Sequence, residues 1–373
     1  MIAMSQHQPR YPLLEIDLDQ LHHNLALLTE HCQAHQIEMV GVVKGFHALP
    51  ELVKLFDQSG FRYLATSRMD QLRAMQSMDL QTPLMLLRVP MLSELGELVA
   101  LAEQSLHSEY AVLQALEIEA ARQGKRHKVI LMADLGDLRE GFWDKDELVE
   151  VATAVERQMP HLELTGIGTN LGCYGSVLPT TAKMDELLEL AERIEQAIGR
   201  KLEVISGGAS SSVYLLQNGA MPRGINQLRL GELALLGRMW NCEMPGMYTG
   251  ALTLKAEVIE CRDKPTYPVG ELGMDALSRV GHYVDRGIRK RALVALGRVD
   301  YGDPSELKPR MGGIEVLGAS SDHTILDVAE AAQPISVGSI LEFDLCYATM
   351  IFLTNTPSVQ ISFKGGHAAE ASM

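Results

Sequence analysis

Short apolar runs alternate with amphipathic stretches over the first 240 residues of the chain. Eight such runs occur, mostly just over twenty residues apart, and the spacing grows after residue 128. Several of them are apolar without alternation, which is typical of strands buried on both faces. The eight predicted strands span residues 39–44, 61–66, 83–89, 104–108, 128–134, 164–170, 202–208 and 226–231.

The stretches between these runs carry helix signals. From Asp19 to His35, Leu21, Leu25 and Leu28 fall on one face of a helix. Residues suited to begin or end helices punctuate the later stretches: Ser93, Ser108, Asp144 and Thr181 as N-caps, with Gly124 and Gly199 as C-terminal stops.

Eight strand–helix repeats predict a closed (β/α)8 barrel of the TIM type. The alternative is a doubly wound open sheet. No G-x-G-x-x-G follows the first run, which disfavours the dinucleotide-binding form of that alternative.

After about residue 240 the pattern changes to strand-like segments separated by Gly/Pro turns, and long helical patterns vanish. We therefore predict an α/β barrel domain over residues 1–240 and an all-β C-terminal domain over residues 241–373. The segment 11–18 precedes the first helix and is also strand-like, so we assign it to the β domain.

Composition narrows the classes of function. The net charge of −15 disfavours nucleic acid as a partner, and no basic stripe offsets it. No apolar run reaches the roughly 18 residues of a membrane span. The N-terminal residues MIAMSQHQPR lack the apolar core of a signal peptide, so we expect a cytoplasmic protein. The five cysteines form no C-x-x-C pair, and no His/Cys/Asp cluster has metal-ligand spacing.

A lysine ends the first predicted strand. Active sites of β/α barrels lie at the carboxyl ends of the strands. Lys44 follows the apolar residues 40–43, and a desolvated lysine becomes a good amine nucleophile for an aldehyde. By position alone, it could equally be a lysine that emerges into solvent.

Two arginines accompany the fifth and eighth strands. Arg139 lies in a charged, glycine-containing loop, where it could orient an anion or form a surface ion pair with Asp137 or Glu140. Arg229 lies within an apolar strand and would need a buried partner.

Glycine- and serine-rich turns follow the seventh and eighth strands. The first is Ser206–Ser212 (SGGASSS), and the second is Gly231-Glu232. In β/α barrels, phosphate sites frequently form after these two strands, since glycines let backbone amides approach an anion. A single such loop is most often only a turn.

Taken together, these segments resemble the alanine racemase fold (fold type III) of pyridoxal-phosphate enzymes, through VVK at 42–44, D-x-G-x-x-R-x-G at 134–141, GIGTN at 166–170, SGGASSS at 206–212 and LRLGE at 228–232. The chain more closely resembles the ornithine racemase branch, from about residue 11 to 360. The stretches that carry this resemblance are MLLRVPMLSE (85–94), HKVILMADLGDLREGFW (127–143), GINQLRLGE (224–232), VGELGMDAL (269–277), RGIRKRALVALGR (286–298) and GASSDHTILDV (318–328).

The resemblance implies roles for residues around the cofactor, pyridoxal 5'-phosphate. Lys44 matches the lysine that holds the cofactor covalently and moves one α-proton. Arg229 matches the arginine that bonds the pyridine nitrogen, which favours racemisation over side reactions. Arg139 matches the arginine of the fifth strand's loop.

Other positions would hold the phosphate or border the ring. Ser210, Gly231 and Glu232 match the phosphate-binding positions. Asn170 stands where alanine racemases have a histidine near the ring. Tyr347 corresponds to the tyrosine that touches the phosphate.

The second catalytic base departs from the family pattern. Alanine racemases supply a tyrosine from the other subunit, in a G-Y-x-D-G motif, and no tyrosine stands in the stretch Gly270–Asp275 that we align with it. We take Glu271, Asp275 and His323 as candidates, in that order. A base from a partner's β domain would make the protein a homodimer.

The implied activity is amino-acid racemisation by a two-base mechanism, in which one group acts on each face of the substrate. Ornithine or another basic amino acid is the expected substrate, and Asp137 or Glu140 could face its cationic side chain or could be solvated loop charges. The alternatives are an alanine or broad-spectrum racemase, a decarboxylase or aldolase of the same fold, and a non-catalytic pyridoxal-phosphate protein. About 130 residues beyond the barrel argue against the last of these.

Overall fold

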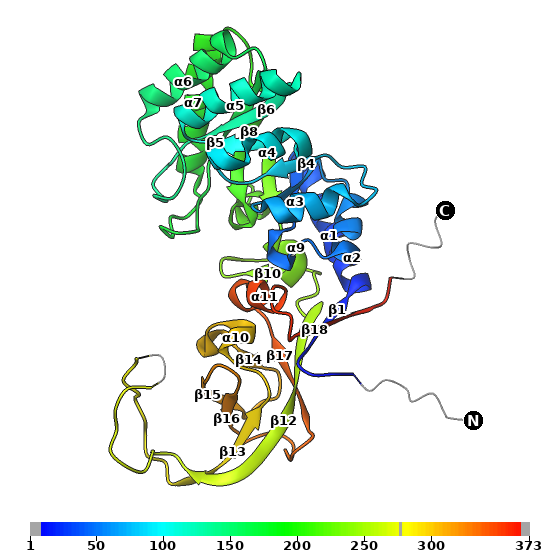
Figure 1. The fold of residues 1–373 in the computed structure, drawn as a ribbon, viewed down its shortest axis with the longest axis vertical. Coiled ribbons are helices and arrows are strands. Elements are labelled where there is room, and N and C mark those ends of the chain that lie inside the picture. Colours follow the sequence, from blue (N-terminus) through cyan, green and yellow to red (C-terminus); the bar gives the residue numbers. More distant parts are fainter. Residues whose placement is uncertain (1–8, 276–277, 367–373) are drawn as a thin grey trace, which may run out of the picture. The chain divides into compact units, whose positions relative to one another are not determined.

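The computed structural model describes residues 9–275 and 278–366. The last two residues of the VGELGMDAL stretch lie outside this part of the chain. The described residues form two compact units (Figure 1). We call Leu21–Tyr248 the barrel unit, and the residues up to Gln20 together with those from Thr249 onward the strand unit.

Eight parallel strands close into a barrel in the barrel unit, in the order of the chain. Each strand pairs with the next, and the last pairs with the first. The predicted barrel is confirmed, and the open sheet is wrong because the two end strands pair. The strands are β2 (Glu38–Val42), β3 (Tyr63–Thr66), β4 (Leu84–Leu86), β5 (Gln104–His107), β6 (His127–Met132), β7 (Leu162–Gly168), β8 (Val204–Ala209) and β9 (Gln227–Leu230).

Helices alternate with these strands along the chain. Within the described residues, no helix is long and apolar enough to cross a membrane. A short hairpin, β10 (Arg238–Met239) and β11 (Cys242–Glu243), follows the last of the helices. The helices are α1 (Leu18–Ala34), α2 (Pro50–Asp57), α3 (Met69–Gln76), α4 (Leu95–Leu101), α5 (Tyr110–Gln123), α6 (Lys145–Gln158), α7 (Thr181–Ile198), α8 (Val213–Gln217) and α9 (Glu232–Leu236).

Local sequence explains several helix ends. The Asp144 carboxylate accepts hydrogen bonds from the amides of residues 146 and 147 at 2.8 and 3.2 Å and begins α6. Gly124 and Gly199 adopt the left-handed conformation and end α5 and α7.

Three of the predicted N-caps are wrong. Thr180, one residue before Thr181, caps α7. Glu109 is the N-cap of α5 in place of Ser108, and Ser93 lies inside the 3-10 helix η2 (Leu92–Glu94). For α7, the Thr180 hydroxyl accepts the Lys183 amide at 3.3 Å, a local hydrogen bond that the sequence offers equally at the adjacent Thr181.

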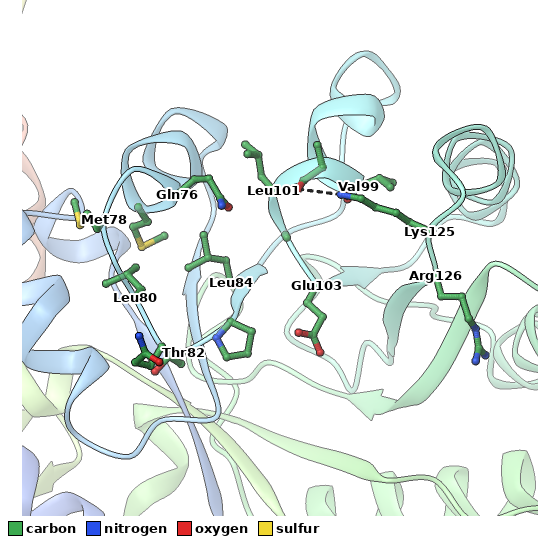
Figure 2. A pocket seen from close by; sticks show the side chains of 15 residues that line it. Gln76, Met78, Leu80, Thr82, Leu84, Val99, Leu101, Glu103, Lys125 and Arg126 are labelled. Atoms are coloured by element: carbon green, nitrogen blue, oxygen red, sulfur yellow. Dashed lines mark hydrogen bonds between the residues drawn. The ribbon is translucent and has the colours of Figure 1, made fainter.

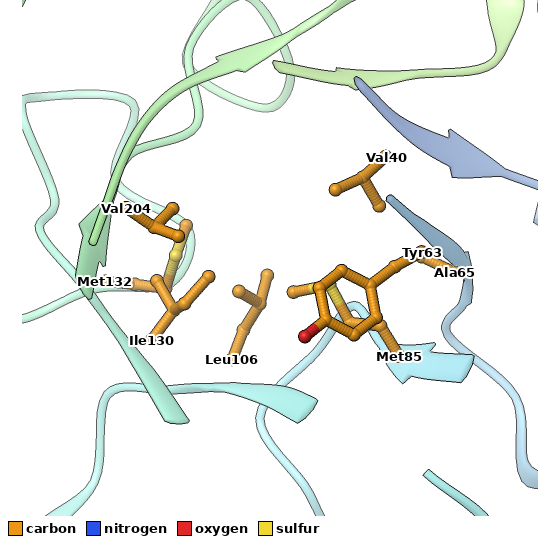
Figure 3. Packing of buried hydrophobic residues seen from close by; sticks show 8 residues of the cluster. All are labelled: Val40, Tyr63, Ala65, Met85, Leu106, Ile130, Met132 and Val204. Atoms are coloured by element: carbon orange, nitrogen blue, oxygen red, sulfur yellow. The ribbon is translucent and has the colours of Figure 1, made fainter. Parts of the chain in front are cut away.

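Apolar side chains from six of the eight strands fill the inside of the barrel. Figure 3 shows this cluster, in which the Tyr63 ring lies among aliphatic side chains and methionines. Its hydroxyl reaches the Glu103 carboxylate at 3.3 Å, which gives the buried ring a polar partner. The cluster consists of Val40, Tyr63, Ala65, Met85, Leu106, Ile130, Met132 and Val204.

The strand unit is an eight-stranded, mainly antiparallel sheet organised around the long strand β12 (Leu252–Pro265). One half of β12 pairs with β1 (Leu13–Asp17) and β17 (Ile340–Asp344), and the other half pairs with β13 (Ile288–Val294). β1 also pairs in parallel with β18 (Gln360–Lys364). The remaining elements are β14 (Lys308–Pro309), β15 (Glu315–Ala319), β16 (Thr324–Asp327), the 3-10 helix η4 (Pro304–Glu306) and the short helices α10 (Arg298–Tyr301) and α11 (Tyr347–Leu353).

A buried polar cluster links β5 to β6. The Ser105 hydroxyl lies 2.7 Å from His107 Nε2 and 2.8 Å from His127 Nε2. Burial, with a smaller contribution from the neighbouring His127, lowers the pKa of His107 to about 3. Burial also lowers the pKa of His127 to about 4. Both imidazoles are therefore neutral in the folded protein near pH 7.

This cluster predicts acid sensitivity. A histidine whose folded-state pKa is depressed binds a proton more readily when unfolded, so stability is complete above about pH 6.5 and falls as the pH drops toward 4. At pH 4, protonation of each histidine in the unfolded state should lower the free energy of unfolding by about 3 kcal/mol relative to neutral pH. Urea unfolding followed by circular dichroism, for wild type and His127→Gln, should show a flatter pH dependence in the variant.

The exposed His22 on α1 provides the control, and His22→Gln should retain the wild-type slope. An unfolding free energy that does not change between pH 6.5 and 4 in the wild type would contradict this assignment.

Candidate active site

Lys44 lies directly after β2, where the chain turns sharply into the 3-10 helix η1 (Lys44–Phe46). The amides of Phe46 and Ala48 both donate to the Val43 carbonyl, at 3.3 and 3.2 Å, which fixes the turn. Burial lowers the pKa of Lys44, and the positive charges of Arg139 and Arg229 act in the same direction. The sulfur of Cys173 and the Glu140 carboxylate oppose them. Lys44 is thus a partly desolvated amine among charged side chains.

Arg229 projects from β9 and is buried, with 5% of its surface exposed. Its Nη1 donates to the Ser206 hydroxyl at 2.6 Å, and its Nη2 donates to the Thr169 carbonyl at 2.7 Å. These are the buried partners that its position in an apolar strand requires. Burial lowers the pKa of Arg229 to about 10, so it still carries a positive charge near neutral pH.

Asp137 is buried and orders the loop that follows β7. Its carboxylate accepts hydrogen bonds from three amides, those of Cys173 (3.3 Å), Tyr174 (3.0 Å) and Val177 (3.3 Å). Because these bonds occupy both oxygens, the structure gives Asp137 a positioning role and leaves little capacity to bind a cationic substrate.

The Arg139 guanidinium contacts both the Glu140 carboxylate and the Cys173 sulfur at the barrel mouth. Its Nη2 donates to Glu140 Oε1 at 2.5 Å, and its Nη1 donates to Cys173 Sγ at 3.3 Å. Burial alone would lower the pKa of Arg139, but Glu140 outweighs it and the pKa is raised. Glu140 retains 19% side-chain exposure and contributes to the field at both Lys44 and Arg229.

The predicted phosphate loops come together. The Ser210 hydroxyl accepts from the Gly231 amide at 3.3 Å and from the Leu233 amide at 3.5 Å, so two backbone donors converge on one oxygen. A Cβ on Gly231 would lie 2.6 Å from the Val42 carbonyl, and the backbone therefore approaches β2 as closely as only glycine allows. Burial raises the pKa of the Glu232 carboxyl to about 7.

The remaining predicted residues are divided between the units. Asn170 is half-buried after β7 in the barrel unit. Tyr347 begins α11 in the strand unit. Glu271, Asp275 and His323 are exposed in loops of the strand unit, and the Asp275 carboxylate accepts the Arg279 amide at 2.9 Å.

Cys173 is the residue that the sequence analysis missed. The cysteines form no C-x-x-C pair, but Cys173 follows the predicted site residue Asn170 by three positions in a strand-end loop. That position is the signal that could have identified it, since barrel side chains at strand ends gather at the mouth.

An open cavity lies away from these residues. It has a volume of about 600 Å³ and lies at the amino ends of β4, β5 and β6, where Leu84, Glu103 and Arg126 are among the residues that line it (Figure 2). Lys125 borders it and donates to the Val99 carbonyl at 3.1 Å. In β/α barrels the amino ends of the strands contribute to stability, and the active site lies at their carboxyl ends. In residues 9–275 and 278–366, no group of three or more His, Cys, Asp or Glu is arranged to bind a metal.

The fold and the mouth of the barrel define a known class. Residues 16–238 match the family "Alanine racemase, N-terminal domain", and the chain belongs to this family. It is 38% identical over 343 residues to the ornithine racemase of Acetoanaerobium sticklandii, covering 91% of this chain and 96% of that protein. It is also 38% identical over 353 residues to the lysine racemase of Thermotoga maritima, covering 94% and 98%.

Solved structures show the same fold. The alanine racemase of Streptomyces lavendulae superposes with a TM-score of 0.72 at 19% identity, covering 97% of this chain and 99% of that one. The D-threonine aldolase of Filomicrobium marinum gives 0.70 at 16% identity, covering 93% and 89%. The predicted arrangement of a barrel followed by a β domain is thus that of the alanine racemase fold.

The raised pKa of Glu232 generates a stability prediction. A carboxyl whose folded-state pKa lies above its unfolded value destabilises the fold once the pH is high enough to ionise it in the unfolded state. Glu232→Gln should therefore stabilise the apoprotein by about 3 kcal/mol at pH 8 and have almost no effect at pH 4. Urea unfolding at the two pH values measures this difference. Glu243→Gln, at an exposed site in the β10–β11 hairpin, is the control and should be neutral at both. Destabilisation by Glu232→Gln at pH 8 would contradict the assignment.

Proposed function

We propose that this protein is a pyridoxal-phosphate-dependent racemase that interconverts the L- and D-forms of a basic amino acid, ornithine or lysine. The observation that carries the proposal is the desolvated Lys44 at the barrel mouth, within the electrostatic influence of the buried Arg229. The 38% identity to an ornithine racemase and a lysine racemase, over more than nine-tenths of the chain, supports the reaction and the substrate class.

The donor set at the barrel mouth fits pyridoxal phosphate. Two backbone amides converge on the Ser210 hydroxyl, where phosphate oxygens would be received together with Gly231 and Glu232. A lysine of lowered pKa is available for the aldehyde. When bound, the cofactor supplies stabilisation of the carbanion formed at the substrate Cα.

The chain's own residues orient the reactants and move protons. Lys44 would hold the cofactor, and its amine, once released, would take or give the α-proton on one face of the substrate. Arg229 would interact with the cofactor ring through its guanidinium, which keeps its proton near neutral pH. Arg139 and Asn170 would also contact the cofactor, and Tyr347 is proposed as a further phosphate ligand.

The acidic group for a cationic side chain is better assigned to Glu140 than to Asp137. Glu140 is partly exposed at the mouth and acts on Lys44 electrostatically. Glu140 pairs with Arg139 but keeps 19% of its side chain exposed, whereas Asp137 is buried and both of its oxygens accept backbone amides. An alanine or broad-spectrum racemase is the competing function, and alanine is therefore included in the assay below.

A homodimer is part of the proposal. Large apolar side chains are exposed in the barrel unit on the loops after β6 and β7 and in the turn of the β10–β11 hairpin, namely Leu138, Trp143, Tyr174 and Trp240. Large exposed apolar side chains are often covered at protein–protein interfaces. A second copy of this chain would cover them and could bring Glu271, Asp275 or His323 to the substrate.

The proposed activity depends on Lys44 and on a basic substrate. Purified holoenzyme should racemise L-ornithine and L-lysine faster than L-alanine, as measured by chiral chromatography. Lys44→Ala should lower the rate by about 10³-fold or more, because it removes the cofactor anchor and one proton-transfer group together. Lys54→Ala, at an exposed site on α2, is the matched control and should retain wild-type rates.

Full activity in Lys44→Ala would exclude the proposed mechanism. A much faster reaction with alanine than with ornithine and lysine would exclude the basic substrate while leaving the racemase intact.

The proposed homodimer should be detectable in solution. Sedimentation velocity at micromolar concentration should give a species of twice the 41.0 kDa chain mass. A single species at the chain mass would remove the partner subunit from the proposal.

A further inference from the structure

The Cys173 side chain is exposed on the loop after β7. Hydrogen bonds to the buried Asp137 fix this loop. Three amides of this loop, including that of Cys173 itself, donate to the buried Asp137 carboxylate. A Cβ on Gly175 would lie 2.5 Å from the Asp137 carbonyl, so the two segments are in close contact. The sulfur is therefore presented by a fixed loop of the barrel mouth.

A guanidinium lies directly beside this sulfur. Arg139 Nη1 donates to Sγ at 3.3 Å, while Nη2 of the same group donates to Glu140 at 2.5 Å. The guanidinium therefore fixes the position of the sulfur at the barrel mouth. Glu140 in turn fixes the orientation of the guanidinium.

The barrel topology places Cys173 and Lys44 on different sides of the mouth. In the closed order of eight strands, β6 is four strands from β2 in either direction, and β7 is three strands away through β9 and β8. Lys44 follows β2, whereas Arg139 and Cys173 follow β6 and β7. The two groups are nevertheless near enough for the sulfur to act on the Lys44 ammonium electrostatically.

We propose that Cys173 is the second proton-transfer residue of the racemase, opposite Lys44. This inference rests on the proposed function. In one direction the Lys44 amine takes the α-proton and becomes an ammonium, and the Cys173 thiol gives its proton to the other face of Cα and becomes a thiolate. In the reverse direction the thiolate takes the proton and the Lys44 ammonium returns one. One proton leaves Cα and one arrives, and solvent resets both groups.

Cys173 has a structural advantage over the earlier candidates. Glu271, Asp275 and His323 are exposed in loops of the strand unit and would have to come from there or from a partner. Cys173 belongs to the same unit as Lys44 and is already oriented by Arg139. Each chain would then contain both proton-transfer groups.

The first experiment separates inversion from exchange. Wild type, Cys173→Ala and Cys173→Ser holoenzymes are incubated with L- and D-ornithine in D2O, and deuterium at Cα and chirality are measured together. Cys173→Ala should lose racemisation by about 100-fold or more, since a general acid–base group contributes about 10² to 10⁴. It should still exchange the α-hydrogen of one enantiomer, with retention, through Lys44.

Cys261→Ser is the control, because Cys261 lies on β12 in the strand unit and has no role in the proposed site. Racemisation by Cys173→Ala within a few-fold of wild type would overturn the proposal, as would an equal loss of exchange from both enantiomers. If wild type neither racemises nor exchanges any amino acid tested, the proposed function fails instead.

The second experiment needs neither cofactor nor activity. Iodoacetamide labelling of the apoprotein, followed by peptide mass spectrometry, should modify Cys173 faster than Cys261. Arg139→Gln should change the rate of Cys173 labelling without changing that of Cys261, because the guanidinium contacts the Cys173 sulfur directly. Equal labelling of Cys173 in wild type and Arg139→Gln would overturn the role of the Arg139 contact.

Discussion

Closure of the barrel between its first and last strands is the constraint on which the site depends. β2 pairs with β9 through Val40 opposite Arg229 and Gly41 opposite Leu230. Gly231 follows β9 directly and lies so close to β2 that any side chain at this position would collide with the Val42 carbonyl. This closure places Lys44 next to the turn proposed to bind phosphate and next to the arginine proposed to face the ring. An open sheet would leave these groups at opposite edges.

The electrostatics of the mouth follow from burial with incomplete charge pairing. Arg229 is bonded to a hydroxyl and a carbonyl, while its opposite charge, Glu140, acts from a distance. Lys44 loses solvation and lies near two guanidinium groups. Such an arrangement destabilises the folded protein and is characteristic of functional sites. Burial also lowers the pKa of a second lysine, Lys145. Unlike Lys44, Lys145 lies in a structural setting, because its Nζ donates to two backbone carbonyls.

The sequence was sufficient for the barrel but not for the connections between site residues. Buried parallel strands leave continuous apolar runs, so all eight could be located, and Lys44 and Arg229 were selected by their positions on them. Loop hydrogen bonds have no periodic signature. The anchoring of the β7 loop by Asp137, and the contact between Arg139 and Cys173, emerge only from the three-dimensional arrangement. For the same reason, a carboxylate that looked available to substrate proves to be occupied by amides.

The central claim is that Lys44 is the residue that carries the cofactor. Borohydride reduction of the holoenzyme, followed by peptide mapping with mass spectrometry, tests it most directly. We expect one pyridoxyl modification per chain, on the peptide containing Lys44, and loss of the yellow colour in step with it. A modification on Lys145 or any other lysine, or no stable modification after complete bleaching, would show that Lys44 does not carry the cofactor.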